Sequence, residues 1–160
     1  MCGIAGLFDT RGKRDFDRDL MRRMSDVQHH RGPDESGYHF EPGVAFAHRR
    51  LSIIDLATGQ QPLFNEDGSV AVVFNGEIYN FQDLVSELEA LGHVFRTRSD
   101  TEVIVHAWEA WGEDCVQRFR GMFAFAVHDR ARDTLFIARD RLAVKPFFYA
   151  LLDDGTLAFG

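Results

Sequence analysis

The N-terminal segment Met1–Asp9 constrains the fold most strongly, because it joins a reactive residue directly to a strand. Removal of the initiator methionine would make Cys2 a residue that carries both a thiol and a free α-amine. An α-amine is partly neutral at cellular pH, and a nucleophile with an adjacent base is activated. The small and apolar residues Gly3–Phe8 predict a buried strand that fixes this end to a sheet. The alternative is a chance cysteine that packs as a small hydrophobe.

Hydrophobic periodicity in the rest of the chain alternates between the period of a strand and that of a helix. Further strands are expected at residues 37–40, 44–49, 70–74, 94–96, 122–127, 134–138, 147–151 and 156–159. Helices are expected at residues 16–27, 80–92 and 99–111, with a short one around Val116 and Phe119. Strands toward both ends and helices between them predict an α+β fold of two sheets with helices packed outside.

Local patterns predict where some of these elements begin and end. Asn75-Gly76, directly after the apolar run 70–74, predicts a sharp turn. Asn80 is placed to cap the helix that follows it. Ser99 and Glu102, three residues apart ahead of an apolar helix, predict a capping box.

Composition narrows the class of protein. A chain of 160 residues with 45% hydrophobic and 27% charged residues is expected to form one globular domain with its own core. A formal net charge of −7 argues against general nucleic-acid binding. The two cysteines, Cys2 and Cys115, show no pairing pattern, and no segment resembles a signal peptide or a membrane span. We therefore expect a cytoplasmic protein, with no membrane partner and with Cys115 in the core.

Motifs for metal and nucleotide sites are missing from the sequence. The seven histidines show no Cys-x-x-Cys or His-Glu-x-x-His spacing, and the adjacent His29 and His30 cannot both face one ion from a helix. Walker and G-x-G-x-x-G loops are also absent, and no spacing selects a Ser-His-Asp triad. The sequence predicts no metal site.

Polar residues occur where the expected strands end. Arg50 is suited to a two-pronged hydrogen bond with a carboxylate, and Asp100 is suited to an ammonium group. Asn75 Nδ2 and the Gly76 N–H have the donor chemistry of an oxyanion hole for acyl transfer. Each residue has a simpler explanation. Asn-Gly is a common tight turn, Asp100 favours a helix N-terminus, and Arg50 beside Arg49 fits a solvated pair.

Eight motifs occur in the order of one known family. They are Met1-Cys2-Gly3-Ile4, Arg31-Gly32-Pro33-Asp34, the run from His48 to Asp55, Gly59-Gln60-Gln61-Pro62, the run from Phe74 to Asn80, Ser99-Asp100-Thr101-Glu102, the run from Gly121 to Phe125, and Arg139-Asp140-Arg141. Together they resemble the class II glutamine amidotransferase (glutaminase) domain of asparagine synthetases, an N-terminal-nucleophile hydrolase. The resemblance covers the whole chain. Phosphosugar-linked amidotransferases instead have Thr-Arg-Trp-Ala-Thr-His-Gly where this chain has Arg49 to Asp55.

The resemblance implies a four-layer αββα sandwich of two mostly antiparallel sheets and the hydrolysis of L-glutamine to glutamate and ammonia. Cys2 matches the nucleophile, with its freed α-amine as the base, directly or through a water. Asn75 and Gly76 match the oxyanion hole. The positions that match groups around glutamine are Arg50 for its α-carboxylate, Glu77 and Asp100 for its α-ammonium, and the backbone near Leu51 and Ile53 for the pocket wall.

The resemblance also places residues 2–160 as one domain of a longer protein. Asparagine synthetases continue into a domain that uses ATP and Mg²⁺ and carries a Ser-Gly-Gly-x-Asp-Ser loop, which this chain lacks. The chain ends in an expected strand at Phe159-Gly160, so we expect a domain truncated at its C-terminal end. In the full protein the ammonia would convert aspartate to asparagine, the glutaminase half would need no cofactor, and a homodimer is compatible with the family.

Two alternatives to this function stay open. The chain could be a non-catalytic regulatory or docking domain on the same fold, or it could supply ammonia to an acceptor other than aspartate. Two departures from the family pattern concern local packing. Ala143 occupies the place of a usual glycine, where a positive φ would strain alanine, and Phe147-Phe148 replaces a more usual Leu-Tyr or Tyr-Tyr pair.

Overall fold

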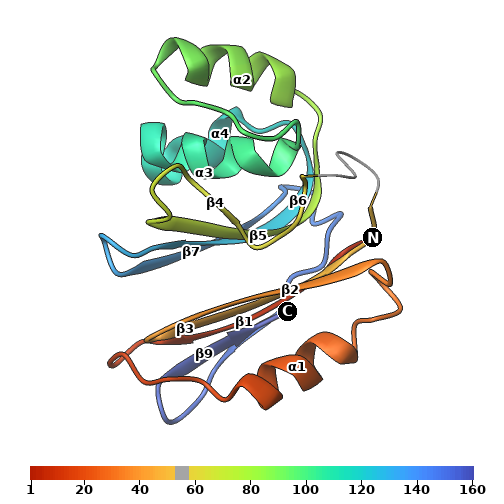
Figure 1. Ribbon diagram of the computed structural model, residues 1–160, viewed down its shortest axis with the longest axis vertical. Helices are drawn as coiled ribbons and strands as arrows, with labels where there is room; N and C mark the ends of the chain where they lie inside the picture. Colours follow the sequence, from red (N-terminus) through yellow and green to blue (C-terminus); the bar gives the residue numbers. More distant parts are fainter. Residues whose placement is uncertain (53–57) are drawn as a thin grey trace.

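The computed structural model describes residues 1–52 and 58–160, which form two antiparallel sheets facing each other (Figure 1). Sheet A has the strand order β2 (Glu35–Glu41), β3 (Val44–Arg50), β1 (Gly3–Asp9), β9 (Thr156–Phe159) and β8 (Tyr149–Leu151). Sheet B has the strand order β4 (Leu63–Phe64), β5 (Val70–Ile78), β6 (Gly121–Asp129) and β7 (Thr134–Arg139).

Helices cover the outer faces of both sheets (Figure 1). Sheet A is covered by α1 (Arg18–Asp26), whose Met21 is fully buried against apolar residues of β1 and β3. Sheet B is covered by α2 (Phe81–Ala90), α3 (Asp100–Trp111), the 3₁₀ turn η1 (Gly112–Asp114) and α4 (Cys115–Arg118). The predicted four-layer αββα sandwich is confirmed. None of the helices in the described residues is long and apolar enough to span a bilayer.

Strand alternation explains how these layers pack. In β5, Val72 and Phe74 belong to the core beneath α3, whereas Ala71 and Val73 belong to the core between the sheets. Small residues on the inner face let the sheets approach closely. At Gly6 in β1, an added Cβ would come 2.2 Å from the Phe159 ring, so a larger residue would displace that ring.

The prediction of a turn at Asn75-Gly76 is wrong. β5 continues to Ile78, and Asn75 and Gly76 pair with Ala124 and Phe123 of β6. Continuous pairing with a long neighbouring strand outweighs the local preference of Asn-Gly for a turn.

Three other local predictions change. The strand expected at residues 94–96 does not form. Asn80 occupies the N-cap position, but its side chain bonds to the backbone of Arg118 and Arg120 and caps nothing. The reciprocal capping box is also wrong. Ser99 caps α3 through the Thr101 N–H, whereas the Glu102 carboxylate accepts backbone N–H groups from residues 96 and 97.

The prediction for Cys115 is confirmed. Its side chain is fully buried at the start of α4, and burial raises the pKa of the thiol to about 12. The expected short helix around Val116 corresponds to α4, and the strands expected at 134–138 and 156–159 correspond to β7 and β9.

Candidate active site

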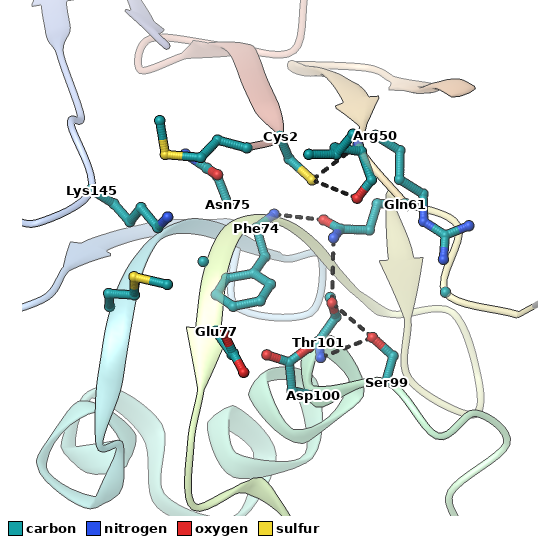
Figure 2. A pocket seen from close by; sticks show the side chains of 15 residues that line it. Cys2, Arg50, Gln61, Phe74, Asn75, Glu77, Ser99, Asp100, Thr101 and Lys145 are labelled. Atoms are coloured by element: carbon teal, nitrogen blue, oxygen red, sulfur yellow. Dashed lines mark hydrogen bonds between the residues drawn. The ribbon is translucent and has the colours of Figure 1, made fainter. Parts of the chain in front are cut away.

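Cys2 lies at one end of the central strand of sheet A, directly before β1 and beside the end of β3 (Figure 2). Its Sγ accepts a hydrogen bond from the Leu51 N–H at 3.4 Å and donates to the Leu51 carbonyl oxygen at 3.8 Å. The Cys2 carbonyl oxygen accepts a bond from Arg31 Nε at 3.1 Å. The partly buried thiol is thereby held in the wall of a pocket of about 170 Å³, where Met1 also lies.

One edge of β5 presents backbone N–H groups to this pocket. N–H directions alternate along a strand, so those of Phe74, Gly76 and Ile78 point away from β6. Gln61 Oε1 accepts the Phe74 N–H at 2.6 Å, and Asp100 Oδ2 accepts the Ile78 N–H at 2.9 Å. The Gly76 N–H lies between these two bonds, in the lining of the pocket. A Cβ at this position would come 2.2 Å from the Met122 carbonyl oxygen, so only glycine fits.

The side chain of Asn75 projects from β5 toward sheet A, on the face of β5 that also carries Val73. Figure 2 shows its amide next to Cys2, above the strand. Behind it, His48 Nε2 of β3 lies 3.2 Å from the Phe74 carbonyl oxygen. Burial lowers the pKa of His48 to about 4, so the ring is neutral at physiological pH and its Nε2–H donates this bond. The bond ties the two sheets together one residue before Asn75.

Gln61 lines the pocket, although the sequence did not predict it as a site residue. It is buried, and it accepts the Phe74 N–H while its Nε2 donates to Thr101 Oγ1 at 3.3 Å (Figure 2). Thr101 Oγ1 also accepts a hydrogen bond from Ser99 Oγ at 3.0 Å. This chain of bonds fixes the start of α3 against β5. The motif Gly59-Gln60-Gln61-Pro62 was the signal that could have identified it.

Two carboxylates, Glu77 and Asp100, face the pocket together (Figure 2). Burial is the main cause that raises the pKa of Asp100 to about 6, and the charge of Glu77 adds to it, although the Ile78 N–H opposes the shift. An ammonium group between the two carboxylates would relieve this repulsion and favour the ionised form of Asp100. One side of the pocket therefore carries two carboxyl groups.

The cationic groups of the pocket are Arg50 and Lys145, and both are buried. Arg50 Nη1 forms an ion pair of 2.9 Å with Glu35 Oε2 in the neighbouring strand β2. The guanidinium is thus oriented by a partly exposed partner, and its planar set of donors has the geometry that matches a carboxylate. Lys145 was not predicted as a site residue, and Figure 2 shows its side chain near Asn75.

Lys145 is positioned by a tight loop around the buried Asp140. The carboxylate accepts backbone N–H groups from Leu142, Val144 and Lys145, and from Phe123 in β6. Ala143, at the centre of the loop, has φ of +53°. A positive φ at this position strains an alanine, as predicted above, and the structure meets that condition.

Most of the residues predicted for the site come together in one pocket. It is lined by Cys2, Arg50, Leu51, Asn75, Gly76, Glu77 and Asp100, and also by Met1, Gly59, Gln61, Phe74, Ser99, Thr101, Met122 and Lys145. Ile53, the remaining predicted residue, lies outside the described residues. Proximity supports the predicted roles without testing them, so the roles stay predictions.

Facing antiparallel sheets between helical layers, with a cysteine at the start of a central strand, define an N-terminal-nucleophile hydrolase fold with a thiol site. The family model of the glutamine amidotransferase domain matches residues 1–160. The chain belongs to this family of enzymes.

Similar proteins agree with this assignment. Asparagine synthetase [glutamine-hydrolyzing] 3 of Bacillus subtilis is 46% identical over 100% of this chain and 26% of its own length. Asparagine synthetase [glutamine-hydrolyzing] 2 of the same organism is 45% identical over 95% of this chain and 20% of its own length. The chain thus spans about a quarter of the length of these relatives. Among solved structures, the glutamine phosphoribosylpyrophosphate amidotransferase of B. subtilis aligns with a TM-score of 0.77 at 20% identity, over 99% of this chain and 41% of that one. This likeness shows the shared fold.

Proposed function

We propose that this domain hydrolyses L-glutamine to glutamate and ammonia through a glutamyl thioester on Cys2. The observation that carries the proposal is the convergence of the Cys2 thiol, the Asn75 amide and the Gly76 N–H in one pocket with Arg50 and two carboxylates. A thiol and two oxyanion donors are the groups that acyl transfer requires. The charged groups match the α-carboxylate and the α-ammonium of an amino acid.

The reaction has two stages. The Cys2 thiol transfers its proton to the α-amine that Met1 removal frees, and its sulfur attacks the side-chain carbonyl carbon of glutamine. The tetrahedral oxyanion accepts hydrogen bonds from Asn75 Nδ2 and the Gly76 N–H. The amine returns the proton to the departing nitrogen, which leaves as ammonia. Water then attacks the thioester, and glutamate leaves as the thiol is restored.

Recognition of the unreactive end of glutamine supplies specificity. Arg50 would hold the α-carboxylate, while Glu77 and Asp100 would hold the α-ammonium. Backbone groups of Leu51 would line the pocket wall, together with residues near Ile53. Binding energy from these groups positions the amide against Cys2 and excludes simple amides.

The larger protein is part of the proposal. A C-terminal synthetase domain that uses ATP and Mg²⁺ would consume the ammonia and convert aspartate to asparagine, as the names of the relatives suggest. Glutamine hydrolysis itself would need no cofactor. The two unpaired cysteines favour the cytoplasm as the compartment. A homodimer of the whole protein is a further prediction, which its mass in solution would test.

Substitution of the nucleophile tests the proposal directly. Ammonia release from L-glutamine should fall by a factor of about 10³ or more in Cys2→Ala, because no other group can form the thioester. Cys115→Ala removes the other thiol, which is buried away from the pocket, and should retain activity. Full activity in Cys2→Ala would disprove the nucleophile assignment.

The main alternative is a regulatory or docking domain that does not react with glutamine. Retention of Met1 would favour this alternative, because the nitrogen of Cys2 would then be an amide that cannot act as a base. Intact mass measurement separates the two possibilities. Loss of one methionine supports the enzyme, and full retention together with absent ammonia release supports the alternative.

A further inference from the structure

Four potential metal ligands from three segments converge beside α3. Glu66 follows β4, His93 lies between α2 and α3, and His106 and Glu109 lie one turn apart on α3. One ligand atom from each lies within 4.8 Å of all the others, and these four residues do not line the Cys2 pocket. We propose that these side chains bind one divalent transition-metal ion, and that Zn²⁺ fits them best.

One direct hydrogen bond joins the cluster, between His106 Nδ1 and Glu109 Oε2, and the other distances are too long for direct hydrogen bonds. His106 Nδ1 lies 3.4 Å from Glu109 Oε2 and 3.6 Å from Glu66 Oε2. His93 Nδ1 lies 3.8 Å from Glu109 Oε2 and 3.9 Å from Glu66 Oε1. Strong charge-assisted bonds are about 2.7–2.9 Å long. Tetrahedral Zn²⁺ with bonds of about 2.0–2.2 Å instead separates its ligand atoms by roughly 3.3–3.6 Å.

The set of ligand atoms selects the kind of ion. Two imidazole nitrogens and two carboxylate oxygens suit Zn²⁺ and similar transition metals, whereas Mg²⁺ and Ca²⁺ prefer oxygen ligands alone. The ligands also differ in exposure. His106 is 1% exposed, whereas Glu66 and Glu109 are 32% and 29% exposed. The partly exposed side chains can move inward to close the longer distances when an ion enters.

Outer partners orient the proposed ligands as they do in metal sites. Glu102 Oε1 faces His106 Nε2 at 3.6 Å, which leaves Nδ1 turned toward the other three ligands. Val94 N donates to Glu66 Oε1 at 3.1 Å, and Asn65 Nδ2 donates to Glu109 Oε1 at 2.8 Å. Carboxylates and amides in this outer position fix the tautomer and direction of a ligand.

His106 Nε2 faces Glu102, on the side of the ring away from the proposed ion. It is a buried nitrogen without a hydrogen-bond partner in the part of the chain that the structure describes. A bound ion at Nδ1 would polarise the ring and strengthen its attraction to Glu102. The ion would also join the turn after β4 and the α2–α3 connection to the middle of α3. Its role would be structural, because it would hold segments together at a distance from the thiol.

The competing explanation uses a proton in place of a metal. Burial alone would lower the pKa of His106, but Glu102, Glu109 and Glu66 raise it to about 9. A protonated His106 among these carboxylates would form an ion-pair network without any bound ion. The two explanations differ in what the cluster binds, so a binding measurement decides between them.

The test is zinc binding to the 160-residue chain with Cys2→Ala, which removes the accessible thiol as a competing ligand. The chain is stripped with a chelator, titrated with Zn²⁺ by calorimetry, and analysed for metal after dialysis. We expect one zinc ion per chain and a rise in Tm of about 5–10 °C at a hundredfold excess over Kd. No retained zinc, or an unchanged Tm, would overturn the proposal in favour of the proton network.

Ligand variants locate the ion. In the same background, His93→Ala and Glu66→Gln should each weaken zinc binding at least tenfold. Both residues are partly exposed, so their substitution leaves the core intact. His29→Ala, at an exposed histidine outside the cluster, is the matched control and should bind zinc like the parent chain. Equal zinc affinity in all three variants would place the ion elsewhere and refute the site.

Discussion

The two ends of α3 use buried polar side chains in opposite ways. At its N-terminal end, Asp100 is held by a backbone N–H and leaves its charge facing an open pocket. About two turns later, the charges of His106 and Glu109 face one another and those of Glu66. The uncompensated carboxylate of Asp100 at the first end is suited to the ammonium group of a substrate. Mutual compensation at the second end is suited to a structural role, with or without an ion.

The largest expected effect on the pocket comes from Asn75→Ala, in the neighbouring strand β5. Loss of one oxyanion donor should lower kcat for glutamine hydrolysis by about 10²–10³, because the donor acts only on charge that develops in the transition state. KM should change little. Steady-state kinetics of ammonia release, with Tm as a control for folding, measures both effects. A kcat close to that of the parent would remove Asn75 from the oxyanion hole.

A smaller effect is expected from Asp100→Asn, which should act on binding. Loss of a charged partner for the α-ammonium should raise KM for glutamine by about 10–100-fold, since such hydrogen bonds contribute about 1.5–3 kcal/mol. Gln82→Ala, on the exposed face of α2, is a neutral control. An unchanged KM in Asp100→Asn would exclude the predicted contact.

The pH dependence of Asp100 gives the same residue a second readout. Its pKa in the folded protein is about 6, above the ordinary value of 3.8. Because the ionised form binds the ammonium group, KM should rise as pH falls below 6. The contribution of Asp100 to stability should instead increase as pH falls, while glutamine binding weakens. The folded state binds this proton more tightly than the unfolded state, so the contribution of Asp100 to stability declines as pH rises from about 4 to about 6. Denaturation of the parent and of Asp100→Asn across this range should differ in slope.

Glu102, in the first turn of α3, faces His106 in the second half of the helix and does not line the pocket, so Glu102→Gln should reduce stability while leaving catalysis nearly unchanged. The buried Glu102 carboxylate accepts the N–H groups of Arg96 and Thr97 and the hydroxyl of Thr97, and it also faces His106. An amide cannot satisfy these donors in the same way, so we expect a loss of about 2–3 kcal/mol in the free energy of unfolding. Chemical denaturation measures the loss. A drop in kcat larger than the drop in stability explains would mean that Glu102 and the pocket are coupled.

The sequence predicted the layers of this fold well and its polar networks poorly. Alternation in segments such as 70–74 reflects burial on two faces, which a local pattern records. Asn75-Gly76 misled the local prediction because pairing with β6, a segment about fifty residues away, decides its conformation. The site residues were found through ordered motifs, since side-chain chemistry alone left a simple explanation open for each.

Residues that act through distant partners were the hardest to predict. Gln61 lies in a loop and forms hydrogen bonds with both β5 and α3, and these partners cannot be identified without the fold. His93 and His106 lie thirteen residues apart, and the α2–α3 connection brings His93 close to both His106 and Glu66. The one local hint was His106 and Glu109, which share a helix face at a spacing of three.

The smallest expected effect concerns the loop that presents Lys145 to the Cys2 pocket. Ala143 has a φ of +53°, a conformation that costs a residue with a Cβ about 1–2 kcal/mol, whereas glycine adopts it freely at some cost in unfolded-chain entropy. Ala143→Gly should therefore raise the free energy of unfolding by about 0.5–1 kcal/mol. Activity should be retained because the loop keeps the hydrogen bonds to Asp140.

Asp133→Gly provides the matched comparison. Asp133 has a φ of +50°, but aspartate tolerates this region better, so its replacement should gain less. Equal gains at both positions would show that the strain at Ala143 is relieved elsewhere in the loop.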